Sequence, residues 1–164
     1  LGQADFSQAN LVRAHLHRAI LFEANFKEAN LIFSDLSDAD MTQANLEFAE
    51  LSWAKLDHTY IEQAVLKGAN LNHVTLTHAH LKNAKLNNSI LEWANLYSAD
   101  LTGTDITNAR LANADLTNAT LTDAIFTNAT GVTKKQILQA RWERLPKGLP
   151  VEWKLPSQNH YPNR

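Results

Sequence analysis

The stretch Ala94-Asn95-Leu96-Tyr97-Ser98-Ala99-Asp100-Leu101 decides the fold, because it contains one triplet twice, five residues apart. The triplet is Ala, then Asn or Asp, then Leu. Further unaltered copies stand at residues 9–11, 29–31, 69–71 and 114–116. Such self-similarity at a fixed period is the signature of a repeat architecture and precedes any other interpretation.

The repeat continues without a break from Phe6 to Phe126. Counting in fives gives 25 positions, all apolar: 19 Leu, three Phe, two Ile and one Met. Two positions earlier, Ala occupies 20 of the 25 sites. The exceptions there are Ser34, Thr59, Val74, Ser89 and Thr104. Both positions therefore behave as inward-facing sites of one continuous core.

A period of five excludes the ordinary elements. On an α-helix, five residues advance about 500°, which scatters successive Leu side chains around the helix. In a continuous strand, an odd period sends them to opposite faces. The chain must therefore turn a corner in every repeat, with Ala and Leu inward and the other three side chains outward.

Four repeats, or 20 residues, are predicted for each coil. This spacing, unlike a spacing of 15, aligns three inner aromatics, Phe6, Phe26 and Phe126. It also aligns three outer aromatics, Phe33, Trp53 and Trp93. The 25 repeats then make about six turns, about 30 Å long at the usual spacing of paired strands.

This pattern resembles that of the pentapeptide-repeat family, over residues 1–130. The resemblance implies an all-β solenoid, a right-handed quadrilateral β-helix of about six coils, and the handedness comes from the resemblance alone. The family is abundant in cyanobacteria, and some members are exported. The resemblance therefore suggests the thylakoid lumen or the periplasm, and the cytoplasm stays open as a location.

The composition excludes some classes of function but does not identify one. The 164 residues are 45% hydrophobic and 20% charged, with a net charge of −2 and a pI near 6.4. That balance is unlike a basic nucleic-acid binder. The absence of cysteine excludes thiolate metal sites and a cysteine nucleophile. Leu1 is in phase with the repeat and is not methionine, which we interpret as removal of an upstream tag or targeting segment.

Residues 131–164 are predicted to cap the solenoid. Thr133 and Gln136 have the spacing of a helix capping box, and Ile137, Leu138 and Trp142 suggest an apolar helix face that ends before Pro146. The helix is expected to cover the last coil. The following strap is expected to pack along the solenoid wall through Leu149, Val151, Trp153 and Leu155. No equivalent cap is predicted at the N-terminal end, and we expect that end to be a candidate dimerisation surface.

One outer column is the candidate interaction stripe: Arg13, Phe33, Trp53, His73, Trp93 and Asn113, flanked by Val12 and Ile32. Contiguous outward aromatics often mark a partner surface. The alternative is that the C-terminal strap folds back over them. Both interpretations stay open at this level, as does incidental exposure.

A histidine cluster is the weak candidate for a metal site. His58 and His78 share one column, and His80 lies around the corner. Zinc needs three or four convergent ligands with second-shell support, so solvated surface histidines are the favoured interpretation. We predict no cofactor.

Other outer columns have a structural interpretation. Lys27, Glu47 and Lys67 alternate in sign, as expected for weak surface ion pairs. Amide and hydroxyl ladders are predicted for Asn88, Asn108, Asn128, Thr107 and Thr127. No nucleophile–base pair and no phosphate-binding loop occurs in the sequence.

The sequence therefore predicts a non-enzymatic structural or protein-interaction module with a protein partner. Mimicry of duplex DNA toward a topoisomerase, a role of some pentapeptide-repeat proteins, is the alternative. It requires dense outer carboxylates, and here 17 acidic residues are nearly balanced by 15 basic ones. No nucleic-acid partner and no membrane span are predicted.

Overall fold

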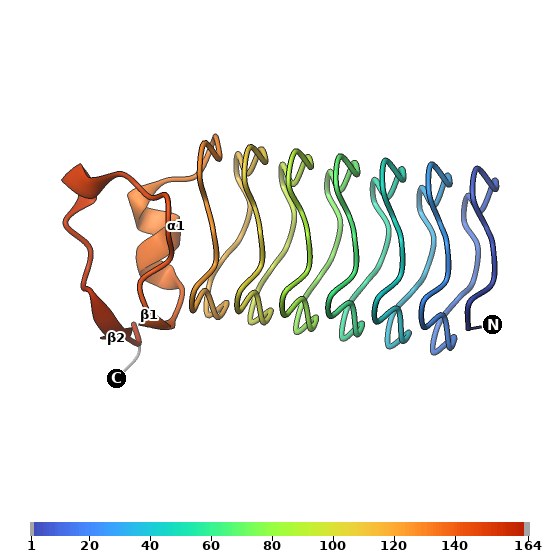
Figure 1. The fold of residues 1–164 in the computed structure, drawn as a ribbon, viewed down its shortest axis with the longest axis horizontal. Coiled ribbons are helices and arrows are strands. Elements are labelled where there is room, and N and C mark those ends of the chain that lie inside the picture. Colours follow the sequence, from blue (N-terminus) through green and yellow to red (C-terminus); the bar gives the residue numbers. More distant parts are fainter. Residues whose placement is uncertain (1, 163–164) are drawn as a thin grey trace.

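The computed structural model describes residues 2–162, and these form a solenoid with a small non-repetitive segment at its C-terminal end (Figure 1). Successive coils lie side by side in a single row. The helix α1 (Lys134–Gln139) and the strands β1 (Trp142–Arg144) and β2 (Gln158–His160) lie beyond the last coil, at the opposite end from the N-terminus. The long axis of the molecule is therefore the axis of the coil.

Parallel backbone pairing joins the coils at a spacing of 20 residues. The bridges run from Asp5 with Asn25 to Arg110 with Thr130, so four pentapeptides make each turn. Each bridge involves single residues rather than long strands, because the chain turns a corner every five residues. The typical contact is short: the Leu31 amide donates to the carbonyl of residue 50 at 2.7 Å. This ladder satisfies backbone groups that the buried core would otherwise leave unpaired.

The corners explain why the motif contains Asn or Asp. In the repeat around Leu31, the Ser34 amide donates to the Leu31 carbonyl at 3.0 Å and closes a β-turn. The Asn30 Oδ1 accepts from the Ile32 amide at 3.2 Å, and Asp35 makes the same bond with Ser37 in the next repeat. A short amide or carboxylate side chain is the residue type that makes this local bond, the Asx turn. The triplet thus encodes the corner and the core together.

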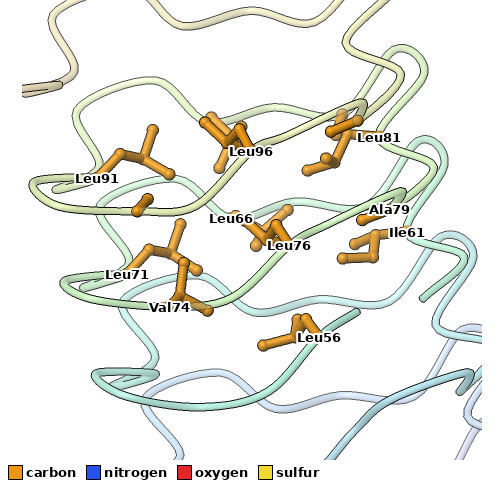
Figure 2. Close-up of a cluster of buried hydrophobic side chains, with 14 of the residues drawn as sticks. Leu56, Ile61, Leu66, Leu71, Val74, Leu76, Ala79, Leu81, Leu91 and Leu96 are labelled. Carbon is orange, nitrogen blue, oxygen red and sulfur yellow. The ribbon is translucent and has the colours of Figure 1, made fainter. Parts of the chain in front are cut away.

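The core contains the predicted inward residues in stacked columns. Figure 2 shows Leu71 below Leu91 and Ile61 near Leu81, from successive coils, all pointing into the solenoid. From Leu21 onward the five-spaced positions up to Phe126 are buried. At the N-terminal end, Phe6 and Phe26 stack with centroids 5.0 Å apart. Burial of one apolar column per face is the main stabilising contribution of the fold.

The helix α1 spans Lys134–Gln139 and begins with the predicted capping box. The Thr133 side chain accepts from the Gln136 amide, and the Gln136 side chain accepts from the Thr133 amide. Gln136 also donates from Nε2 to the Ala114 carbonyl at 2.7 Å, which ties the helix to the last coil. Ile137 is its buried residue.

The predicted helix face was wrong at Trp142. The helix ends at Gln139, and Trp142 begins the strand β1, Trp142–Arg144. The reason is the backbone ladder of the last coil. Arg141 donates its amide to Ala119 and accepts from Leu121, both at 2.8 Å, and a helical residue could not do both. Trp142 is nevertheless buried, with its Nε1 donating to the Pro156 carbonyl at 3.2 Å.

The predicted packing of the strap along the wall was also wrong. The segment contains a 3-10 turn, η1, at Val151–Trp153 and a strand β2 at Gln158–His160, which pairs antiparallel with β1. It stays at the end of the solenoid (Figure 1). Lys147 pairs with Ala124 and Phe126 of the last coil, so the backbone there continues the ladder. Leu149, Trp153 and Leu155 are partly buried against the hydrophobic core. Val151 is 92% exposed at the tip of the turn.

At the other end, Phe6, Leu11 and Leu16 are only partly buried, because no other coil of the described residues covers them. A dimer through this end stays a prediction. Within residues 2–162, no helix has the length and hydropathy needed to cross a membrane.

Candidate interaction surface

The predicted aromatic column is a continuous stack of rings. Phe33 and Trp53 have centroids 6.3 Å apart, Trp53 and His73 4.0 Å, and His73 and Trp93 5.9 Å. The planes of the last two pairs are within 6° of parallel. At the N-terminal end of this stack, the Arg13 guanidinium lies 5.9 Å from the Phe33 ring centroid and makes a cation–π contact. We call residues 33, 53, 73 and 93 the aromatic column.

The solenoid positions these rings through its corners. Each ring belongs to the third residue of a β-turn, where the backbone has a positive φ: 59° at Phe33, 61° at Trp53, 55° at His73 and 59° at Trp93. Turns with a positive φ at this position favour Gly or Asn. The equivalent corners elsewhere often use those residues: Gly68, Gly103, Asn83, Asn88, Asn108, Asn113, Asn118 and Asn128. A bulky aromatic is therefore not what the turn itself selects.

The C-terminal segment does not cover this column. Phe33 and Trp53 are each 52% exposed, and Trp93 is 56% exposed. The alternative in which the strap buries the aromatics is thus wrong for this structure. His73 is less exposed than its neighbours.

Trp53 and Trp93 each have an indole N–H without a protein acceptor among the residues that the structure describes, in contrast to Trp142. The indole nitrogen is a donor only. The column thus combines apolar ring edges with unused N–H groups.

The flanks of the column are mixed in character. On one side Val12 is 41% exposed and Ile32 is partly buried. Further along this flank Glu92 pairs with Arg110 at 2.7 Å. The charge of this carboxylate is therefore already balanced, and the surface beside Trp93 carries no strong net charge.

The three histidines of the predicted cluster lie in two separate stacks. His58 and His78 stack with centroids 5.1 Å apart, while His80 stacks on Tyr60 at 4.7 Å. Tyr97 contacts His78 edge-on. Among the described residues, no group of three or more His, Asp or Glu side chains is placed to hold a metal ion.

The predicted ion ladder is confirmed on another wall. Glu47 lies between Lys27, at 3.8 Å, and Lys67, at 3.3 Å. The amide ladder is present where Asn108 donates to Asn88 at 3.2 Å. Both ladders repeat at 20 residues and contribute little energy at exposed positions.

Sequence reasoning missed another exposed aromatic, Phe48, which is 48% exposed on that wall. Its ring lies where a Cβ at Gly68 would be, and Lys67 lies 5.9 Å from the ring centroid. The sequence contained one signal for this contact, because Phe48 and Gly68 are 20 residues apart and therefore lie at the same corner of successive coils. Among residues 2–162, Phe48 forms no ring stack with another aromatic, which makes it a useful comparison for the column.

Comparisons with known proteins agree with this architecture. The family model for pentapeptide repeats matches eight copies, over residues 1–32, 24–63, 56–92, 64–103 and 94–130. No curated protein sequence is significantly similar to this chain. The fold and its five-residue period define a repeat solenoid, and the chain belongs to the pentapeptide repeat family, whose members form right-handed β-helices.

Three solved structures illustrate the likeness. HetL, a pentapeptide repeat protein involved in heterocyst differentiation regulation from the cyanobacterium Nostoc sp. strain PCC 7120, has 28% identity and a TM-score of 0.50, covering 91% of this chain and 79% of its own. Rfr23 from the cyanobacterium Cyanothece 51142 has 30% identity and a TM-score of 0.47, covering 57% of each chain. A pentapeptide repeat protein from the Arabidopsis thaliana thylakoid lumen has 26% identity and a TM-score of 0.29, covering 55% of this chain and 66% of its own. Proteins of this family are generally structural or interaction modules.

Proposed function

We propose that this chain is a non-enzymatic protein-interaction module that binds its partner through the aromatic column. The observation that carries the proposal is the exposure of Trp53 and Trp93, each more than half exposed at a corner where the backbone favours Gly or Asn. Aromatic residues, Trp above all, are enriched at the energetic centres of protein interfaces.

The geometry favours a rigid, preformed surface. The corners are fixed by the ladder between coils, and each ring is held by its neighbours in the stack. Side chains that are already ordered lose less entropy on binding. A partner therefore meets a surface that requires little rearrangement.

Mimicry of duplex DNA is less favoured by the same observations. On the wall of Glu47, lysines on both sides neutralise the carboxylate, so this column presents no run of negative charge. A DNA mimic needs a dense array of carboxylates. The location in the thylakoid lumen or periplasm stays a prediction.

The test is a capture experiment with matched variants. The double variant Trp53→Asn/Trp93→Asn replaces both indoles with a residue used at equivalent corners, and Phe48→Asn does the same on the other wall. Immobilised wild type and Phe48→Asn should retain the same partner from an extract of the source organism, whereas the double variant should lose it. Equal capture by all three proteins would overturn the proposal.

A further inference from the structure

The aromatic column has two protruding indoles with a shorter ring between them. Trp53, His73 and Trp93 lie at the same corner position of successive coils with nearly parallel planes. An imidazole is smaller than an indole, and His73 is accordingly the less exposed of the three. The surface is therefore a ridge, a notch and a second ridge along the solenoid axis.

The stacking limits which ligands fit this surface. Between Phe33 and Trp93, the facing sides of the rings are covered by their neighbours at centroid distances of 4.0–6.3 Å, so the rings inside the stack present their edges to solvent. A sugar ring or a nucleobase would need an open aromatic face for stacking. The addition of a β-strand is also disfavoured, because the backbone amides of the aromatic column already donate to carbonyls of the next coil.

The unused hydrogen-bonding groups point to a partner that is rich in acceptors. The indole N–H groups of Trp53 and Trp93 donate only, and ring edges carry a positive partial charge. A polyproline II segment has the complementary character, because proline has no amide N–H and the carbonyls of this helix make no internal hydrogen bonds.

The repeat distances also match. The centroid separations of 4.0 and 5.9 Å place the two indoles about 10 Å apart along the axis. One turn of a polyproline II helix, three residues at about 3.1 Å, advances about 9.3 Å. Equivalent positions of the helix can therefore meet both ridges, with an intervening side chain in the notch above His73.

We propose that the aromatic column binds a proline-rich segment of a partner protein in the polyproline II conformation. The indole N–H groups of Trp53 and Trp93 donate to its carbonyls. This inference rests on the proposed function, and it specifies the chemistry of the partner at that same surface. The segment lies along the solenoid axis, across the coils.

A peptide titration tests the proposal. The probe is a fluorescein-labelled, N-acetylated and C-amidated peptide of ten prolines, followed by fluorescence anisotropy, with a labelled (Gly-Ser)5 peptide as the control. Wild type and Phe48→Asn should bind the oligoproline saturably and the control peptide at least tenfold more weakly. Trp53→Asn/Trp93→Asn should lose at least tenfold in affinity.

Two further variants separate hydrogen bonding and shape from general apolar contact. Trp53→Phe/Trp93→Phe keeps aromatic rings but removes both N–H donors, and it should also lose about tenfold in affinity, the size expected for two hydrogen bonds of modest net strength. His73→Trp fills the notch and should weaken binding. If both variants bind the oligoproline as wild type does, the proposed mode of binding is wrong.

The remaining outcomes are also decisive. Absence of saturable binding of the oligoproline to wild type would overturn this inference, and the capture experiment would still decide the proposed function independently. Self-association of wild type in sedimentation velocity, abolished by Trp53→Asn/Trp93→Asn, would assign the surface to a second copy of the chain and overturn the inference as well.

Discussion

Trp53 and His73 stack with ring centroids 4.0 Å apart and planes 5° from parallel, although each side chain leaves a backbone with a positive φ. Stacking contributes about 0.5–1.5 kcal/mol for such a pair. The left-handed backbone costs a bulky residue a similar amount. The two effects nearly cancel, so the column adds little to the stability of the fold.

The first prediction follows from this balance. Trp53→Asn should change the free energy of unfolding by less than about 2 kcal/mol, because the loss of stacking is offset by a residue that suits the turn. Thermal unfolding followed by circular dichroism measures it. A much larger destabilisation would show that the column is a structural element of the solenoid.

A buried hydroxyl without a partner is a second test site. Ser34 occupies an Ala position, and its Oγ has no hydrogen-bond partner within the described residues. Ser89 occupies the same position elsewhere and donates to the Leu86 carbonyl at 2.6 Å. Because an unsatisfied buried hydroxyl costs about 1–3 kcal/mol, Ser34→Ala should stabilise the protein by about 1 kcal/mol more than Ser89→Ala does. Equal effects of the two substitutions in chemical denaturation would contradict the assignment.

The inward column tolerates no charge. Leu71 is completely buried, so Leu71→Asp places a carboxylate in the stack and should destabilise the fold by several kcal/mol or prevent it from forming. Gln63→Asp is the control, at an exposed corner whose conformation Asp accepts. The two thermal midpoints should differ widely, and similar midpoints would refute the inward placement of Leu71.

The contact of the C-terminal segment with the last coil depends on Gly148. Its φ is 75°, and a Cβ there would lie 2.7 Å from the Cα of Thr127. Gly148→Ala should therefore loosen this segment and increase tryptic cleavage at Arg144 and Lys147. Gly2→Ala is the control, since its Cβ would meet only the Phe22 carbonyl, at 3.5 Å. Unchanged cleavage of Gly148→Ala would contradict the close approach.

The corner carboxylates predict a dependence of stability on pH. Burial raises the pKa of Asp35, but hydrogen bonds from the side chain and amide of Ser37, together with the charges of Lys55 and His17, hold this pKa below its ordinary value. A carboxyl whose pKa is lowered by folding stabilises the protein above the unfolded pKa and loses this contribution as pH falls. The thermal midpoint should thus decrease below about pH 4.

Asp35→Asn isolates this contribution. Asparagine keeps the Oδ1 acceptor, as Asn30 does in the preceding repeat, but does not titrate. The variant should lose less of its thermal midpoint between pH 5 and pH 3 than wild type does. The same decrease in both proteins would exclude Asp35 as a source of the pH dependence.

Much of the solenoid follows directly from its period. Positions such as Leu31 and Ala54 could be assigned inward, because no helix or strand buries every fifth residue. The sequence separation between Trp53 and Trp93 is a multiple of the 20-residue turn, which predicts that they lie in one column. The ring stack confirms this placement.

The C-terminal segment could not be predicted in this way. Trp142 has helical spacing from Leu138, but the backbone of the last coil needed hydrogen-bond partners, and Arg141 supplies them only in an extended conformation. Such long-range pairing overrides local propensity. The exposure of the aromatic column could not be predicted from the sequence either, because the path of the C-terminal segment decides whether the wall is covered.

The most direct measurement is photocrosslinking from the column itself. Phe33 and Phe48 occupy the same corner position, with φ of 59° and 58° and exposed fractions of 52% and 48%. Each is replaced with benzoylphenylalanine, and the protein is irradiated in an extract of the source organism. We predict a dominant protein adduct from position 33 and little adduct from position 48. The adduct from position 33 should be lost when Trp53→Asn/Trp93→Asn is added. Equal adducts from both positions would contradict the central claim that the aromatic column is the interaction surface.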